Sequence, residues 1–144
     1  MPQFAPHGSS IFEFKDQIVI LRSRGPFNVE HVHAVVAAYR KAAESLRQNG
    51  PWATINIIHE SMLLTAEGVT AMGESARLSR ELGRCAAAYV VDESVEGYNL
   101  IMPALRKVCA DLLPIEAFPD LPQAQAWCQQ QIELARQDQL LPPS

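Results

Sequence analysis

The chain has 144 residues, a length that suits one domain. Its formal net charge is −4, and its basic residues are scattered among acidic ones, so the sequence offers no basic surface for nucleic acid. No apolar run reaches the roughly 18 residues of a membrane-spanning helix. The N-terminus also lacks the charged and apolar regions of a signal peptide. We therefore expect a cytoplasmic protein that has no membrane span and does not bind nucleic acid.

The cysteines are Cys85, Cys109 and Cys128, an odd number of widely spaced residues with apolar neighbours. This pattern favours buried free thiols in a reducing compartment over disulfides. Their spacing contains no C-x-x-C pair, which a zinc site or a redox motif would need. We expect neither a metal ion nor a cofactor.

The first ten residues, rich in proline, are interpreted as a flexible arm. Two β-rich runs follow, Ile11–Phe14 and Ile18–Leu21, and the turn-like residues between them predict a hairpin. Asn28 is a good N-cap, and apolar residues recur at helical spacing from there to about Gln48. The apolar, β-branched run Trp52–Ile58 then predicts a central strand.

Thr65 can cap a second helix that ends at Gly83, and the apolar run Cys85–Val91 predicts the next strand. A third helix is predicted over Tyr98–Leu113, with Pro103 inside its pattern, where it bends the helix or lies in its first turn. A short strand, Ile115–Phe118, comes next.

A last helix begins after Asp120, which resembles a capping box with Gln123. Residues 137–144 are interpreted as a flexible tail. The order β-β-α-β-α-β-α-β-α predicts a single α/β domain over residues 11–136, with a mixed sheet of about five strands and about four helices.

Three local features support a family resemblance. The first is Gly25, followed by the capping residue Asn28, before the first helix. The second is the start of the second helix, Thr65-Ala66-Glu67-Gly68. The third lies in the C-terminal part of the chain, where Phe118-Pro119-Asp120 is followed by Ala124-Gln125-Ala126-Trp127-Cys128. Over about Ile11 to Arg136 the chain resembles a diverged branch of the STAS-like domains, the family of the anti-sigma-factor antagonists. The resemblance implies a STAS-like fold and a bacterial regulatory module that binds a protein partner.

The resemblance also bears on regulation by phosphate. Phosphorylatable antagonists carry a serine just before the glycine that opens the second helix, and here that position is Glu67. A carboxylate has the same preference for a helix N-terminus as a phosphate, but it cannot be switched. We therefore expect no phosphoserine switch, and we interpret the nearby Thr65 as an unmodified N-cap.

The usual catalytic motifs are missing from the sequence. His59-Glu60 begins like H-E-x-x-H, but Leu63 stands where the second histidine is needed. Two further histidines, His31 and His33, lie on different sides of a predicted helix and cannot share a metal ion. An enzyme would need an acid–base pair such as His59 with Asp92 or Glu60, and no spacing selects that pair. We therefore expect a protein that is not an enzyme.

The residues after the parallel strands are expected to gather at one edge of the sheet, where ligands of open α/β sheets bind. Three of them, Met62, Leu63 and Leu64, are apolar: they either fold back onto the core or form an exposed contact patch. The predicted partner-binding residues are His59, Glu60, Met62, Leu63, Leu64, Thr65, Glu67, Gly68, Asp92 and Tyr98.

Two other partners remain open. One alternative function is binding of a small apolar, lipid-like ligand in a cavity lined by the apolar helix faces. A homodimer is also plausible, because the edge strands of small mixed sheets invite pairing.

Overall fold

Five strands form one mixed sheet in the computed structural model, which describes residues 8–140. The strand order in the sheet is the order in the chain. The first two strands are antiparallel, and each later strand is parallel to the one before it. The strands are β1 (Ser9–Lys15), β2 (Ile18–Arg24), β3 (Trp52–His59), β4 (Arg84–Val90) and β5 (Ile115–Phe118).

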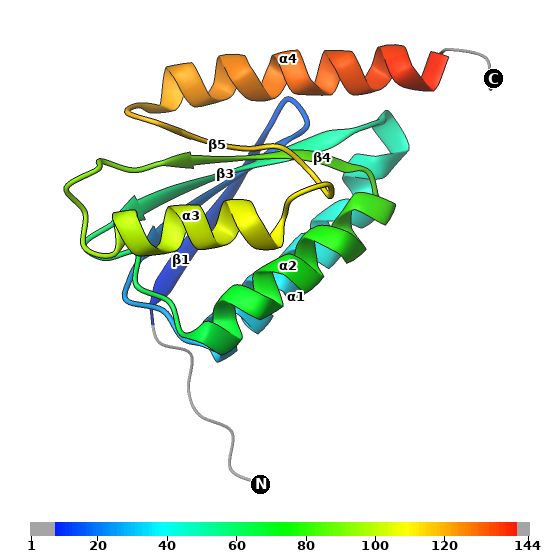
Figure 1. Ribbon diagram of the computed structural model, residues 1–144. Coiled ribbons are helices and arrows are strands. Elements are labelled where there is room, and N and C mark those ends of the chain that lie inside the picture. The colour runs from blue at the N-terminus through cyan, green and yellow to red at the C-terminus, as the bar shows by residue number, and fades with distance from the viewer. Residues whose placement is uncertain (1–7, 141–144) are drawn as a thin grey trace, which may run out of the picture.

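Four α-helices cover the two faces of this sheet unequally. In Figure 1, α4 runs along one face, whereas α1, α2 and α3 lie on the other. The helices are α1 (Val29–Leu46, followed by a 3-10 turn, Arg47–Asn49), α2 (Ala66–Glu81), α3 (Tyr98–Val108) and α4 (Leu121–Leu140). The predicted α/β layout is thus confirmed.

The face under α4 is built from small and β-branched residues. Along α4, Ala124, Cys128 and Ile132 recur every four residues, and each is 0% exposed. They pack on a row of strand residues in register across the sheet, Ile20, Ile55 and Ala88. One helix therefore buries the central part of this face, whereas the β1 residue Ile11 on the same face is 71% exposed.

The opposite face has two apolar clusters beneath three helices. Under α1, the cluster is built around Trp52, Tyr39 and Leu21. Under α2 and α3, it is built around Tyr89 and Met102. β3 and β4 are therefore buried on both faces, which explains their nearly continuous apolar runs.

The predicted ends of the domain require correction. β1 begins at Ser9, inside the predicted arm, because the backbone of Ser9 and Ser10 pairs with the end of β2. Helix α4 continues to Leu140, so the predicted tail from residue 137 is partly helical. The remainder of the predicted arm and tail, residues 1–7 and 141–144, lies outside the described residues.

The third helix is shorter than predicted. Helix α3 ends at Val108, and the chain reverses through Asp111, whose φ is 66°. The reversal turns Leu113 back onto the cluster under α2 and α3, where it is buried. The apolar pattern of the sequence extends past the end of the helix because Leu112 and Leu113, which lie in the turn, also pack against this cluster. Pro103 lies beyond the first turn of the helix.

The three cysteines are free, as predicted. Burial raises the pKa of the Cys85 thiol to about 11 and that of Cys128 to about 12. Among residues 8–140, no helix is long and apolar enough to cross a membrane.

Candidate functional site

Three connections meet at one edge of the sheet, at the carboxyl ends of β2, β3 and β4. We call this edge, together with the first residues of the helices that follow β3 and β4, the strand-end rim: residues 25–28, 59–68 and 91–98. The middle connection is hydrogen-bonded to both neighbours: Phe27 N donates to Leu63 O at 2.8 Å, and Met62 N donates to Glu96 O at 2.8 Å. The buried Ser61 adds a side-chain bond, from Oγ to Glu96 Oε1 at 2.9 Å. The rim is therefore one connected surface.

Two of the three apolar residues of the middle connection fold back onto the core. Met62 is 2% exposed and belongs to the cluster under α2 and α3. Leu64 packs against the same cluster and forms a parallel bridge with Phe27. Leu63 is half-buried beside Gly97 and belongs to no core cluster of the described residues. The sequence left open whether these residues fold back onto the core or form a contact patch: Met62 and Leu64 fold back, so they support the rim from beneath.

Two glycines make room for these leucines. A Cβ at Gly97, where φ is 87°, would lie 2.8 Å from Leu63 Cδ2. A Cβ at Gly68 would collide with the Leu64 side chain. The glycine that opens α2 is thus a packing requirement, and Gly68 itself is buried.

The start of α2 presents its polar side chains to solvent. Thr65 Oγ1 accepts a hydrogen bond from Gly68 N at 3.1 Å, which confirms the predicted N-cap. Glu67 is exposed in the first helical turn, where the helix dipole favours a negative charge. This part of the rim carries a fixed carboxylate beside a hydroxyl that is already used for capping.

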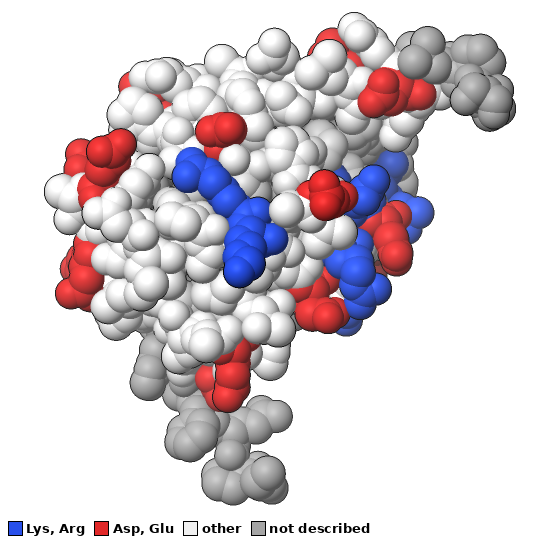
Figure 2. Space-filling view, in the orientation of Figure 1, with Lys and Arg blue, Asp and Glu red and all other residues white. Residues whose placement is uncertain are grey.

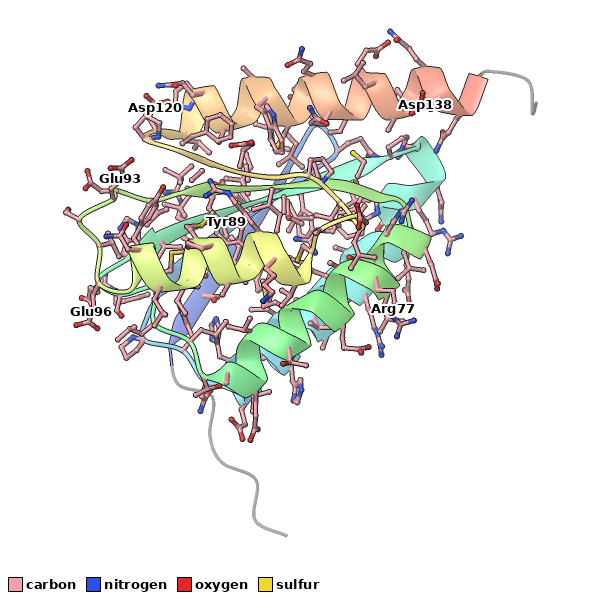
Figure 3. The ribbon with its side chains drawn as sticks, in the orientation of Figure 1. Arg77, Tyr89, Glu93, Glu96, Asp120 and Asp138 are labelled. Atoms are coloured by element: carbon pink, nitrogen blue, oxygen red, sulfur yellow. The ribbon has the colours of Figure 1, made fainter. Side chains whose placement is uncertain are left out.

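Carboxylates dominate the rim. Asp92, Glu93 and Glu96 follow β4, and Figure 3 shows Glu93 and Glu96 pointing outward from this connection. Asp92 Oδ1 accepts two hydrogen bonds from Ser94, which hold the pKa of the Asp92 carboxyl below its usual value. In Figure 2 this margin of the molecule carries separate red side chains on a white surface, whereas most Lys and Arg side chains in view lie over the helices away from it.

A shallow groove lies at the same edge, beside the start of α3. Its volume is about 350 Å³, and Asp92, Glu93 and Tyr98 line it together with the end of β5. The groove combines two carboxylates with aromatic and apolar surface. It places Asp92 and Tyr98 together, as the sequence predicted for residues that follow parallel strands.

The acid–base pair that an enzyme would need is not assembled. Among the described residues, no hydrogen bond or ion pair joins His59 to Asp92 or to Glu60. Glu60 instead forms an exposed ion pair with Arg24, with Oε1 2.6 Å from Nη1. In the described part of the chain, no group of three or more His, Cys, Asp or Glu side chains is arranged to hold a metal ion.

A cavity lies directly beneath the middle connection, and its polar residues were not among the predicted site residues. Asn56, Tyr89 and His31 line it together with apolar side chains of α1, α2 and α3. The signal in the sequence is one asparagine inside a mostly apolar strand, since asparagine is depleted in strands.

Comparison with known proteins gives no assignment: no protein-family model matches the chain, and neither does any curated protein.

Proposed function

We propose that the protein is a non-catalytic regulatory module that binds a protein partner through the strand-end rim. The observation that carries this proposal is the connected loop surface. Residues 59–65 are hydrogen-bonded on both sides and held from beneath by Met62 and Leu64. A surface that is ordered before binding loses little conformational entropy when a partner docks.

The exposed charges indicate the chemistry of the partner. Glu67 and Glu93 project from different connections of the rim, and Asp92 borders the groove. We infer a partner with a basic contact surface and an apolar or aromatic side chain that enters the groove. Electrostatic complementarity of this kind mainly increases the association rate and the specificity.

The resemblance to anti-sigma-factor antagonists favours the same use of the start of α2. Because Glu67 carries a permanent charge, we propose that binding is constitutive and does not depend on phosphorylation. The three free thiols are consistent with a cytoplasmic location, which we include in the proposal.

Charge reversal at the rim tests the proposal. Glu67→Lys with Glu93→Lys inverts two exposed charges and leaves the buried residues untouched. The matched control is Glu44→Lys with Asp138→Lys, two exposed acids on α1 and α4 outside the rim. We expect affinity capture with quantitative mass spectrometry to find a partner that wild type and control retain and that the rim variant loses at least tenfold.

The melting temperatures of the three proteins should lie within a few degrees of one another, because all four substitutions are on the surface and the reversed charge at the N-terminus of α2 costs only about 1 kcal/mol. A set of captured proteins that is the same for the rim variant and for wild type would refute the proposal. Equal loss in the rim variant and in the control would also refute it, since the effect would then follow net charge alone.

A further inference from the structure

The cavity beneath the rim lies between the sheet and the first halves of α1 and α2. Its volume is about 40 Å³, room for a few water-sized groups. It is lined by Phe27, His31, Val32, Val35, Asn56, Ile58, Met62, Leu64, Met72, Tyr89, Ile101 and Leu105. The lining residues include no Asp, Glu, Lys or Arg, so the cavity is neutral and mostly apolar.

Asn56 lies in the middle of the central strand β3, between Leu21 of β2 and Tyr89 of β4. Its Oδ1 atom is buried, and within residues 8–140 it has no hydrogen-bond partner. Buried polar side chains nearly always have a partner, because an unpaired carbonyl loses its water without replacement. An apolar residue would suit this position better for stability alone.

Tyr89 adds a second polar group beside Asn56. The two residues are in register on adjacent strands, so their side chains lie on the same face of the sheet. The Tyr89 side chain lies inside the molecule, between β4 and the helices (Figure 3), and the residue is only 3% exposed. Among the described residues, no side chain or backbone group is hydrogen-bonded to its hydroxyl. The lining of the cavity on the sheet side therefore includes one residue with a carbonyl oxygen that is unpaired within the described chain, Asn56, and one with a hydroxyl, Tyr89.

His31 closes the cavity on the α1 side without adding a charge. Its ring stacks on Phe27 with a centroid separation of 4.7 Å, and its Nε2 lies 3.1 Å from Ser10 Oγ. Burial lowers the pKa of His31, so the ring is neutral at physiological pH. The cavity therefore has no cationic group to neutralise a carboxylate or a phosphate.

We propose that this cavity binds a small uncharged molecule through a hydrogen-bond-donating head group, such as a primary amide or an alcohol. The head donates to Asn56 Oδ1 and exchanges a second hydrogen bond with the Tyr89 hydroxyl. The apolar part of the ligand extends toward Phe27, Leu64 and Met72, three half-buried residues of the lining. The proposal does not rest on protein binding at the rim, although Phe27, Met62 and Leu64 belong both to the rim and to the cavity lining.

Four probes of four heavy atoms each, small enough for a cavity of about 40 Å³, test the chemistry of the head group: acetamide, propan-2-ol, acetone and acetate. Binding to the full chain is measured by calorimetry and by the shifts of the Asn56 side-chain amide signals in NMR spectra at pH 7.5. We expect saturable binding of acetamide and propan-2-ol. Acetone has no donor and acetate is charged, so both should bind at least tenfold more weakly.

Conservative variants connect the binding to the two polar groups. Asn56→Leu keeps the shape of the side chain and should weaken acetamide binding at least tenfold, and Tyr89→Phe should weaken it several-fold. Asn99→Leu is the matched control, since Asn99 is exposed on α3, and should bind like wild type. Native mass spectrometry of freshly purified protein should show a small molecule bound to wild type and absent from Asn56→Leu.

Three outcomes would overturn the proposal. One is the absence of saturable binding for all four probes, with only water beside Asn56 in a high-resolution structure. Another is equal binding of the donor and non-donor probes. The third is undiminished acetamide binding by a folded Asn56→Leu protein.

Discussion

Replacing Asn56 by leucine should make the ligand-free protein more stable. Leucine is branched at the same position as asparagine, so it fills the same space with two methyl groups. The substitution removes one buried acceptor that has no partner within residues 8–140. A group of this kind costs about 1–3 kcal/mol, so the free energy of unfolding should rise by about that amount. For a chain of this size, each kcal/mol corresponds to about 2–4 °C in melting temperature.

Urea unfolding measures this change directly. Trp52 is fully buried beside α1, so its fluorescence reports the loss of the core. The unfolding midpoint of Asn56→Leu should rise without a change in the slope, as expected when only stability changes. The exposed control Asn99→Leu should stay within about 0.5 kcal/mol of wild type. A folded Asn56→Leu protein that is less stable than wild type would show that the amide is satisfied in the free protein, and would refute the reasoning.

Three further changes test other contacts. Gly68→Ala should destabilise the protein because the new methyl group displaces Leu64, although alanine favours a helix over glycine by about 1 kcal/mol. In a Leu64→Ala background the same substitution should stabilise the protein. A double-mutant cycle of urea midpoints measures this reversal. Arg84→Lys should lower the free energy of unfolding by about 1–3 kcal/mol, measured by thermal or urea unfolding. The buried guanidinium donates from Nε and Nη2 to Thr54 Oγ1 at 3.1 and 2.7 Å, and lysine cannot form both bonds. An unchanged midpoint would contradict this. The thiol of Cys128, whose pKa burial raises from 9.0 to about 12, contributes stability that is fully present below pH 9 and lost as the pH rises toward 12. Urea midpoints should therefore fall as the pH rises from 9 to 10.5. The burial of Cys128 would be contradicted if a thiol reagent at pH 8 reacted with it as fast in the folded as in the unfolded protein.

The order of elements was predictable because its signals are local. Helical spacing of apolar residues, β-branched runs and the caps Asn28, Thr65 and Asp120 each act over a few residues. The placement of Asp92 and Tyr98 at one edge also followed, since parallel strands end on the same side. What could be predicted of the rim therefore came from topology.

The remaining features depend on contacts between distant parts of the chain. Because β3 is buried on both faces, its sequence does not alternate, and the face to which Asn56 points cannot be derived from it. The burial of Met62 depends on α3 and on the cluster beneath it. Likewise, Ser9 becomes part of a strand only because the end of β2 lies beside it. The cavity and the supported rim are therefore properties of the assembled domain.

The solitary position of α4 has a consequence for synthesis. Strands are added to the sheet in chain order, so each βα unit can dock on its predecessor as it leaves the ribosome. The face under α4 is different, because Ile20, Ile55 and Ala88 stay uncovered until the last helix is made. A chain that stops before α4 would expose a continuous apolar sheet face, a substrate for chaperones and for aggregation. Whether α4 has docked therefore decides whether this apolar face of the sheet is covered or exposed.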